Sequence, residues 1–388
     1  MLLVGPLYVN HLRRWAEHSV ANGCTVSVAG HLRPERSLAD LTGVAEQVEV
    51  APEGLWELGS VRRVAWLRDV LRRLEPDLIH AHWLPTWGYF AAFSGRRPLV
   101  VTPWGSDLYL ATGARRARAD RALERADAVL ARSCHMRRAI LARGVPAERV
   151  HQVDLGVDLD RFRPASPREG ARLRRELELP PGPIILSTRA GTPLYNLEVV
   201  LDAFRRFRRR RPDATLLMVH NGAPFSRSLR ASLHGVDGNS GVRVVGNVPH
   251  ADIPKYLAVA TAGISIPRSD GSPSSVWEAL ASGVPMVLSD LPQIDERVGA
   301  SGAVRLVEPR PDAVASALHE IVADPQLRKR MSQAGRAWAE ANSDRREQVE
   351  RLGTVYAAIT KGAPARAATA LAANTRKDQV AGAHPGPS

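Results

Sequence analysis

Short apolar runs alternate with amphipathic stretches along most of this chain, and the alternation occurs twice. Strand-like runs at 1–5, 24–30 and 77–83 are interspersed with helical stretches at 11–23 and 60–76. Apolar runs of strand length that alternate with helices predict a parallel sheet covered by helices on both faces. The same rhythm restarts further along the chain, so two doubly wound α/β domains in tandem are expected.

The boundary between the two domains is predicted within residues 153–170. This stretch, VDLGVDLDRFRPASPREG, breaks the rhythm with Gly, Pro and alternating charge. We therefore assign residues 1–160 to the first domain and 161–345 to the second. With 388 residues, of which 44% are hydrophobic, the chain is long enough for two domains of ordinary size.

The C-terminal part of the sequence reads as a long helical stretch followed by a tail. The stretch, about residues 312–361, is broken near Asp324-Pro325 and again near Asn342-Ser343. Its last part, 346–361, is expected to pack back on the N-terminal domain. Residues 362–388 are rich in Ala, Gly and Pro with few large apolar groups, which predicts a disordered tail.

Charge and cysteine content narrow the class of protein. The net charge of +13 comes mostly from Arg scattered through helical stretches, without the aromatic-basic interleaving of nucleic-acid binders, so no nucleic-acid partner is expected. Two cysteines, Cys24 and Cys134, are too few for a disulfide framework and are expected to be buried, which fits a reducing cytoplasm. No apolar run approaches the ~18 residues of a membrane span. The basic helix at 60–76, which contains Trp66, has two interpretations: a solvated face, or a peripheral contact with the inner face of a membrane.

The stretch RSDGSPSSVWEALASGVPMVLSD, residues 268–290, carries the clearest sign of a binding site. It follows a predicted strand at 261–267, forms a loop, and enters a helix that ends at Gly283. Open parallel sheets bind ligands at the carboxyl ends of their strands, and a helix N-terminus suits a phosphate. Glu278 is placed to accept hydrogen bonds from a ribose diol, and Asp270 from a second polyol. The alternative is that Ser274 only caps the helix and Glu278 is a surface acid.

These residues resemble the E-x7-E signature of the retaining group 1 glycosyltransferases of family 4, with Asp270 in place of the first Glu. LGVDLDRFRP at 155–164 is similar to the linker segment of that family, and DLIHAHW and VVTPWGSD resemble two of its N-terminal strand ends. The resemblance implies the GT-B fold, in which two Rossmann-like domains face each other across an interdomain cleft. It also implies transfer of a sugar from a nucleoside-diphosphate sugar to an acceptor hydroxyl with retention, without a metal or a cofactor.

Site roles follow from the resemblance residue by residue. Glu278 holds the ribose, Asp270 the hydroxyls of the donor sugar, and Arg189 the charge of the leaving diphosphate, because a guanidinium stabilises charge that builds on phosphate oxygens. The diphosphate and sugar are expected to bind the segment formed by Gly271, Ser272, Pro273, Ser274, Ser275 and Val276.

The N-terminal domain is expected to carry the acceptor side. Gly5 is expected to allow close approach of the donor, and Asn10 and His11 follow it in a loop and helix start. Trp104 stands where the family commonly has His, which leaves Asp107 to orient the acceptor and His82 as a neighbouring polar group. His80 shares a strand face with His82, which makes a metal pair conceivable, but no third ligand is evident and no metal site is expected.

The sequence departs from the family at a second point and leaves rival functions open. The family usually follows its Arg with a Lys, whereas this chain has Tyr195 and Asn196 in the corresponding region. A sugar-nucleotide epimerase of similar fold and a noncatalytic nucleotide-sugar-binding protein therefore stay as alternatives. The base, the sugar and the acceptor, whether glycan, glycolipid or natural product, are not indicated by the sequence.

Overall fold

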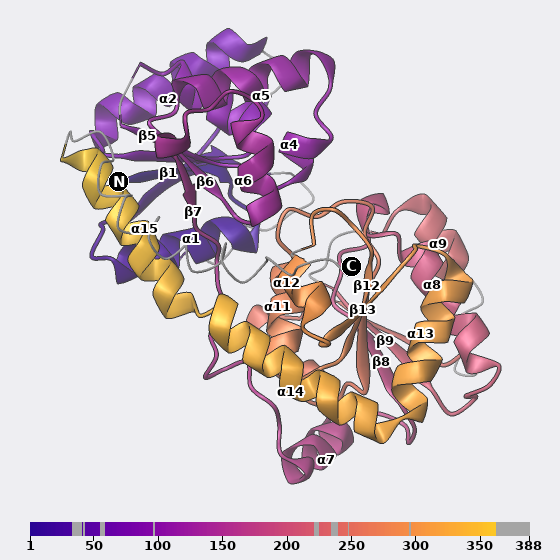
Figure 1. The fold of residues 1–388 in the computed structure, drawn as a ribbon. Coiled ribbons are helices and arrows are strands. Elements are labelled where there is room, and N and C mark those ends of the chain that lie inside the picture. The colour runs from indigo at the N-terminus through magenta and orange to yellow at the C-terminus, as the bar shows by residue number, and fades with distance from the viewer. Residues whose placement is uncertain are drawn as a thin grey trace, which may run out of the picture. The chain divides into compact units, whose positions relative to one another are not determined.

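The chain forms two compact units in the computed structural model (Figure 1). The structure describes residues 1–32, 41, 43–54, 59–95, 98–220, 225–233, 240–246, 248–294 and 296–361. Unit 1 comprises Met1–Asp154 together with the chain from Val349 onward, and unit 2 comprises Leu155–Gln348. The boundary expected at residue 160 therefore falls a few residues inside unit 2. The tail at 362–388 lies outside the described residues.

Unit 1 is built on a seven-stranded parallel sheet with strand order β3-β2-β1-β4-β5-β6-β7. The order runs outward in one direction from β1 and in the other from β4, so the strand order reverses between these two neighbours. Such a reversal opens a crevice at the carboxyl ends of the two strands, where ligands bind in open α/β sheets. The strands are β1 (Leu2–Pro6), β2 (Ser27–His31), β3 (Gln47–Val50), β4 (Ile79–His82), β5 (Leu99–Thr102), β6 (Ala128–Ala131) and β7 (Val150–Gln152).

Helices cover both faces of this sheet. Leu2 and Val4 join a core with residues of α2, α3, α5 and α6, whereas Trp15 of α1 contacts the His80 ring on the opposite face. Successive strand residues point to opposite faces of the sheet. Because helices bury both faces, the residues on both are apolar, and each strand appears in the sequence as a continuous apolar run. The helices are α1 (Asn10–Ala21), α2 (Gly59–Leu74), α3 (Tyr89–Ala92), α4 (Ser106–Tyr109), α5 (Gly113–Arg125) and α6 (Cys134–Leu141), with a π-helical turn at Leu84–Gly88.

The chain returns to unit 1 through helix α15 (Arg345–Thr360), which runs beside α1 in Figure 1. The Tyr356 hydroxyl lies 2.7 Å from Nδ1 of His80 and 3.4 Å from the Ser19 hydroxyl. Asn22 Nδ2 donates a hydrogen bond to the Val349 carbonyl at 2.8 Å. The C-terminal helix thus supplies a buried part of the unit that begins at residue 1.

Unit 2 contains a six-stranded parallel sheet with strand order β10-β9-β8-β11-β12-β13. Here the strand order reverses between β8 and β11, so the carboxyl ends of these two strands form the expected place for a ligand. Both sheets confirm the predicted doubly wound folds. The strands are β8 (Ile184–Ser187), β9 (Thr215–Val219), β10 (Val242–Val245), β11 (Ala262–Ser265), β12 (Met286–Ser289) and β13 (Val304–Val307).

Helices also pack on both faces of the second sheet. Ile185 lies in a core lined by α8, α9 and α13, whereas Ile184 and Leu186 lie in another lined by α10, α11, α12 and α14. The helices are α7 (Pro167–Glu176), α8 (Leu197–Arg208), α9 (Arg227–Leu233), α10 (Ile253–Leu257), α11 (Ser274–Ala281), α12 (Glu296–Ala300), α13 (Pro311–Ala323) and α14 (Pro325–Asn342).

Helix ends follow local chemistry that the sequence displays. The Asp324 carboxylate accepts hydrogen bonds from the backbone N–H groups of Gln326 and Leu327, so α14 begins at the predicted break. Gly283 has φ of 73° just after α11, a left-handed conformation that glycine adopts without a steric penalty. Helix α7 was not predicted, because the start of this helix lies within the stretch that was expected to be a linker.

The structure bears on two predictions about side chains at the surface, those for Cys134 and Trp66. Cys134 is exposed and not buried, because it is the first residue of α6 and lies at the surface. Trp66 packs against the unit 1 core and its ring centroid lies 6.1 Å from that of Trp87, so this ring is not displayed for a membrane. Among the described residues, no helix has the length and apolar character needed to cross a bilayer.

Candidate donor and acceptor sites

An ion pair between Arg189 and Asp270 joins the two strand ends where the order of the second sheet reverses. Arg189 follows β8 and Asp270 follows β11, and their Nη2 and Oδ2 atoms lie 2.5 Å apart. The two side chains are 8% and 12% exposed, so the pair is largely shielded from water. This geometry brings together two residues that the sequence assigned to one site from positions 81 residues apart.

Two further contacts fix the Arg189 guanidinium. Its Nε donates a hydrogen bond to the Ser265 hydroxyl at 2.7 Å, and its Cζ lies 4.9 Å from the centroid of the Tyr195 ring. A cation over an aromatic face is attracted by the ring quadrupole, so Tyr195 favours this position of the charge. Tyr195, noted from the sequence as a departure from the family, therefore belongs to the same cluster.

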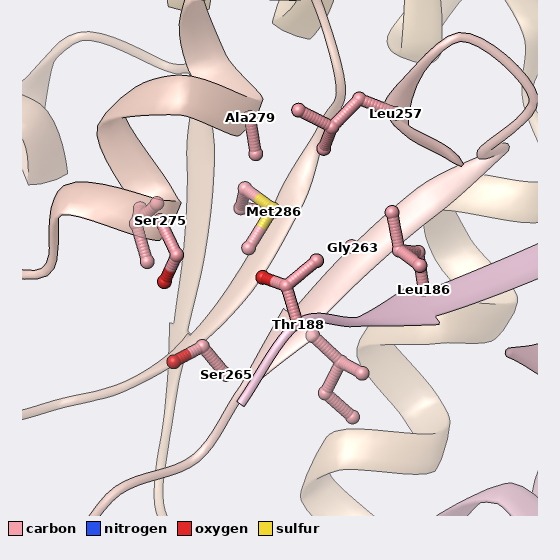
Figure 2. A pocket seen from close by; sticks show the side chains of 10 residues that line it. Leu186, Thr188, Leu257, Gly263, Ser265, Ser275, Ala279 and Met286 are labelled. Carbon is pink, nitrogen blue, oxygen red and sulfur yellow. The ribbon is translucent and has the colours of Figure 1, made fainter. Parts of the chain in front are cut away.

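Buried hydroxyls without hydrogen-bond partners occur on the same chain segments as this pair and in the first turn of α11. Ser187, Ser269 and Ser275 each have a buried Oγ for which the described residues supply no partner. Buried polar groups in folded proteins are nearly always satisfied, so such atoms point to a bound water, ion or ligand. Figure 2 shows Ser275, Ser265 and Thr188 around a small pocket of about 10 Å³ that Met286 and Leu186 also line.

In the loop before α11 and in its first turn, some backbone N–H groups have a backbone hydrogen-bond partner among the described residues and others do not. The N–H of Ser274 donates to the Ser272 carbonyl at 3.0 Å, and the N–H of Val276 to the Pro273 carbonyl at 2.7 Å. Within the described part of the chain, the N–H groups of Gly271 and Ser275 have no such partner. Ser275 thus offers a ligand both its backbone N–H and its hydroxyl.

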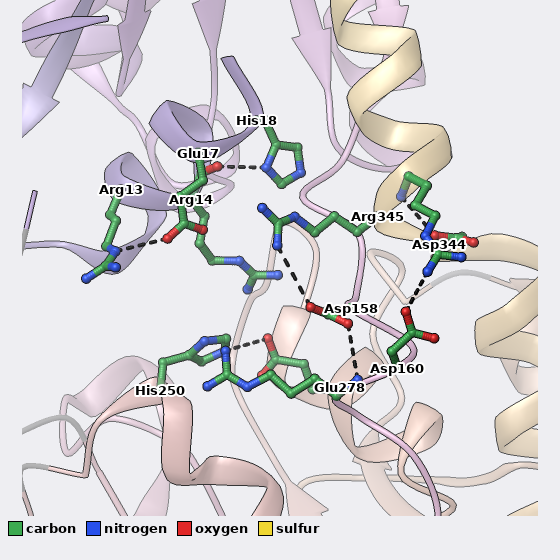
Figure 3. Close-up of polar contacts among 12 residues, drawn as sticks. Arg13, Arg14, Glu17, His18, Asp158, Asp160, His250, Glu278, Asp344 and Arg345 are labelled. Carbon is green, nitrogen blue, oxygen red and sulfur yellow. Dashed lines mark hydrogen bonds and ion pairs between the residues drawn. The ribbon is translucent and has the colours of Figure 1, made fainter. Parts of the chain in front are cut away.

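Glu278 lies in the second turn of α11 and is held by a residue that the sequence did not single out. Its Oε1 lies 2.9 Å from Nε2 of His250, as drawn in Figure 3. The Glu278 side chain is 5% exposed and that of His250 is 34% exposed. His250 also contacts the Phe162 ring, with 5.5 Å between centroids. A buried carboxylate with an imidazole partner is not the surface acid of the alternative interpretation.

In unit 1, Asp107 is fully buried and bonds to backbone groups. Its Oδ2 accepts from the N–H of Leu84 at 2.9 Å, and its Oδ1 accepts from the N–H groups of Trp104 and Gly105 at 2.8 and 2.9 Å. Burial raises the pKa of Asp107, and the backbone hydrogen bonds oppose that rise. In this structure the carboxylate therefore holds the loops after β4 and β5 in place.

His82 lies at the end of β4, beside the reversal of strand order in the first sheet. It is fully buried, and the described residues give neither ring nitrogen a hydrogen-bond partner. Burial, with contributions from His80, His11 and Arg132, lowers the pKa of His82 well below the ordinary range. The ring is therefore neutral, and it has one donor and one acceptor that are not used within the described structure.

Trp104 lies close to both candidate histidines of this edge. Its ring centroid is 6.1 Å from that of His82 and 5.3 Å from that of His11. Trp83 contacts it edge-on at 5.8 Å and has φ of 74°, a strained value for a residue with a side chain. Strained residues cluster at functional sites, and Trp83 was not predicted from the sequence.

The remaining acceptor-side candidates lie at the end of β1. Asn10 is exposed and is the first residue of α1, and His11 follows it. A Cβ on Gly5 would lie 3.1 Å from Cδ1 of Leu12 and 3.4 Å from Cβ of His82. In the described structure the absence of a side chain at Gly5 thus leaves space in which Leu12 and His82 pack inside unit 1.

His80 has a structural role. Its ring nitrogens lie 2.7 Å from the Tyr356 hydroxyl and 2.7 Å from the Thr102 hydroxyl, and burial lowers the pKa of His80 to about 3. The ring is 4.2 Å from that of His82, as the strand period predicts. Across the residues that the structure describes, no group of three His, Cys, Asp or Glu is arranged to hold a metal ion.

Several residues of the two sites escaped the sequence analysis. His250, Ser265 and Arg132 lie 28, 76 and 22 residues from the partners they bond, namely Glu278, Arg189 and Asp154. Arg132 follows β6 and forms a buried ion pair with Asp154 at 2.8 Å. Ser265 lies within the strand predicted at 261–267, but the sequence gave no signal for its partner or for the partners of His250 and Arg132.

Half of the chain is similar in sequence to a known sugar-transferring enzyme. It is 29% identical over 204 residues to a GDP-mannose-dependent alpha-(1-6)-phosphatidylinositol monomannoside mannosyltransferase of Mycobacterium tuberculosis, an overlap of 50% of this chain and 52% of that protein. This chain thus spans about half the length of that curated relative.

Solved structures with low sequence identity share the fold. Sucrose-phosphate synthase from Thermosynechococcus elongatus superposes with a TM-score of 0.77 at 19% identity, over 93% of this chain and 99% of that one. HepE of Anabaena in complex with UDP and glucose gives a TM-score of 0.76 at 19% identity, over 92% and 99%. At this identity the likeness concerns the fold alone.

Two family models together match most of the chain. The first, Glycosyltransferase Family 4, matches residues 9–161, and the second, Glycosyl transferases group 1, matches residues 171–338. The matched ranges include Trp104 and Asp107 in the first and Arg189, Asp270 and Glu278 in the second. The chain therefore belongs to the group 1 glycosyltransferases of family 4, with the two parallel-sheet domains of the GT-B fold.

Proposed function

We propose that this protein is a retaining glycosyltransferase that moves a sugar from a nucleoside-diphosphate sugar to an acceptor hydroxyl of a glycan or glycolipid. The observation that carries the proposal is the cluster at the carboxyl ends of β8 and β11. There a fixed cation, Arg189, is bonded to Ser265, and Ser265 lines one pocket with Ser275, whose buried hydroxyl in the first turn of α11 lacks a partner among the described residues. A cation, open hydroxyls and a helix N-terminus together suit a diphosphate.

The diphosphate and the ribose of the donor each have residues with matching chemistry in unit 2. Arg189 takes the diphosphate, together with the N–H and hydroxyl of Ser275. Glu278 accepts hydrogen bonds from the ribose, oriented by His250. GDP-mannose is the first donor to test, because the relative from Mycobacterium tuberculosis is described as GDP-mannose-dependent. UDP-glucose is the second, since HepE was crystallised with UDP and glucose.

The acceptor is assigned to the edge of unit 1 that carries His11, His82 and Trp104. An indole can stack on a sugar ring, and its N–H can donate a hydrogen bond. A lipid-linked acceptor is the first class to test, because the Mycobacterium relative acts on a phosphatidylinositol mannoside by its name.

The reaction needs no nucleophile from the protein. The acceptor oxygen forms a bond to the anomeric carbon while the bond from that carbon to the diphosphate oxygen breaks. The acceptor proton passes to the departing phosphate oxygen on the same face, and the nucleoside diphosphate leaves. Arg189 stabilises the charge that develops on the phosphate, which lowers the barrier because this charge is larger in the transition state.

Binding and turnover experiments test the proposal. Titration calorimetry with GDP and UDP should show binding to the wild-type protein, and Glu278→Ala should weaken it by about 100-fold, the scale of a lost charged hydrogen-bond pair. Unchanged affinity in Glu278→Ala would contradict the assignment. Incubation of a nucleotide sugar without acceptor separates the alternatives, since an epimerase converts the sugar, a transferase hydrolyses it slowly, and a noncatalytic binder leaves it intact.

A further inference from the structure

The ion pair of Arg189 raises the question of what Asp270 does in the donor site. The family resemblance implies a sugar-binding acid at position 270. In the structure, however, its Oδ2 lies 2.5 Å from Nη2 of Arg189, and both side chains are about nine-tenths buried. A carboxylate that is paired with a buried cation accepts its hydrogen bond and also holds that cation in place.

The geometry of guanidinium makes such a restraint useful. A guanidinium has five N–H bonds in a rigid planar fork, so fixing two of its nitrogens fixes the direction of the third. Ser265 takes the Nε–H and Asp270 takes a bond from Nη2. Within the described part of the chain no acceptor is assigned to Nη1, which leaves two N–H bonds at one corner of the fork for an anion.

The Tyr195 ring restrains the same group from its face. The Arg189 Cζ lies 4.9 Å from the Tyr195 centroid, so the guanidinium is held both at its edge and at its face. In this chain the Tyr occurs in the region where the family usually has a Lys. This chain thus has one restrained cation, Arg189, in the region where the family usually has two.

The short acid fits this arrangement better than a long one. A Glu at 270 would carry one more methylene and would have to bend this longer side chain to keep the 2.5 Å contact that Asp270 makes with Arg189. A carboxylate next to a diphosphate is also repelled by it unless a cation lies between them. Arg189 placed between the two anions removes that repulsion.

We infer that Asp270 is a positioning residue that aims Arg189 at the leaving diphosphate, and that it acts on the reaction through Arg189 and not through the sugar. The inference rests on the proposed function, because it assigns the anion as the donor diphosphate. The guanidinium bridges Asp270 and the phosphate through different nitrogens, and Ser265 and Tyr195 keep its plane constant during the departure of the nucleotide.

A double-mutant cycle of Arg189→Ala and Asp270→Asn tests the inference. Arg189→Ala should lower kcat by about 100- to 1000-fold, the usual loss for one preorganised transition-state donor. Asp270→Asn should lower kcat by about 10-fold with little change in the KM of the donor. The double variant should be no slower than Arg189→Ala, because Asp270 has no partner left to position. Multiplication of the two losses would overturn the inference.

A second measurement separates positioning from contact with the sugar. Asp270→Asn should leave the ratio of affinities for the nucleotide sugar and for the free nucleoside diphosphate unchanged, since neither gains from a carboxylate bound to Arg189. A selective loss of affinity for the nucleotide sugar would show that Asp270 binds the sugar and would also overturn the inference.

The control is Asp213→Asn, which breaks the exposed Arg211–Asp213 ion pair in the same unit and should leave kcat unchanged. Circular dichroism and thermal melting of every variant establish that it is folded. Asp270→Ala provides a second variant for the cycle if Asp270→Asn is unfolded. A wild-type protein that binds no nucleotide sugar would refute the proposed function itself, whereas an active wild type with multiplicative losses refutes only the role of Asp270.

Discussion

Asp107 Oδ2 accepts a hydrogen bond from the backbone N–H of Leu84 at 2.9 Å and so ties together the loops that follow β4 and β5. Leu84 begins the π-helical turn Leu84–Gly88 immediately after the strained Trp83. Segments of π-helix are frequent at functional sites, and strain persists only where the surroundings over-determine it. The bond from the Leu84 N–H to Asp107 fixes the residue next to the strained Trp83, and the bond from the Trp104 N–H fixes the loop that carries Trp104.

Asp107→Asn should destabilise unit 1 and leave the donor affinity of unit 2 unchanged. The amide presents an N–H group to at least one backbone N–H, so a buried donor loses its acceptor, at a cost of about 1–3 kcal/mol in the free energy of unfolding. Urea denaturation measures this loss and calorimetry the affinity for GDP and UDP. Asp69→Asn, at an exposed acid of the same unit, is the control and should change the unfolding free energy by less than about 1 kcal/mol. Equal stability of Asp107→Asn and the wild type would contradict this structural role.

His250→Ala should weaken nucleotide binding less than Glu278→Ala does. Loss of the 2.9 Å contact removes one restraint on the Glu278 carboxylate, and a partly exposed bond of this kind is worth about 1 kcal/mol, or roughly 5-fold in affinity. Calorimetry with GDP measures the effect. His319→Ala, a histidine on α13 that packs on Phe207, is the matched control and should bind GDP like the wild type. Similar losses in both variants would indicate a general effect on unit 2.

Stability should fall with acidification because His80 is buried as a neutral ring. Burial lowers the pKa of His80 to about 3, whereas an unfolded histidine has a pKa of about 6.5, so between these pH values the unfolded state binds the extra proton. The free energy of unfolding should therefore decrease by about 1.4 kcal/mol per pH unit for this residue as the pH falls below 6.5. His82, whose pKa is also lowered, adds to the slope.

His80→Gln should flatten that dependence. Chemical denaturation at pH 7, 6, 5 and 4 gives the slope for the wild type and the variant. The variant should be less stable at pH 7, because the bonds to Tyr356 and Thr102 are altered, and should lose less stability per pH unit below 6.5. An identical slope in both proteins would mean that His80 is not the group that takes up the proton.

Trp104→Ala should raise the KM for the acceptor by about 10-fold and leave nucleotide affinity unchanged. The ring gives a face for stacking on a sugar, an interaction of about 1–1.5 kcal/mol. Trp104→Phe keeps a smaller face and should show a smaller rise. Trp66→Phe, which changes a ring packed on the unit 1 core, serves as the control for general destabilisation. An unchanged KM in Trp104→Ala would remove this residue from the acceptor site.

Contact with an anionic membrane surface is testable at the start of α2. Val61 is 82% exposed there and Arg62 beside it is also exposed, so this end of the helix offers an apolar group next to a positive charge. Val61→Asp should reduce cosedimentation with vesicles that contain phosphatidylglycerol by several-fold. Val244→Asp, at an exposed apolar position in unit 2, should not. Equal reductions would indicate a general effect of charge.

The fold could be predicted from the sequence because its signals are local. Asp324 before Pro325 marks the start of α14, and the periodic apolar runs mark the strands. Even the helix α7 that was missed has a local signal, since Ser166 caps it by accepting from the N–H of Glu169, as in a capping box. Its position in a stretch rich in Gly and Pro outweighed that signal.

The sites could be predicted only where one segment carries the chemistry. Glu278 and Asp270 lie in one motif, and Arg189 follows a recognisable strand. The partnership of Glu278 with His250 and that of Asp107 with the Leu84 N–H depend on how distant loops meet, which no periodicity encodes. Asp107 shows the limit well, because a carboxylate at a strand end suggests a ligand, whereas the folded chain uses it for its own backbone.

The bond between Tyr356 and His80 has a practical consequence for anyone who divides this protein into separately expressed pieces. A fragment that stops at Asp154 would lack the hydroxyl that satisfies a buried imidazole, as well as the helix that contributes the buried side chains of Leu352 and Val355. Its soluble production therefore requires residues 349–361 to be grafted on or supplied in trans, and a cut in the middle of the gene yields two incomplete halves.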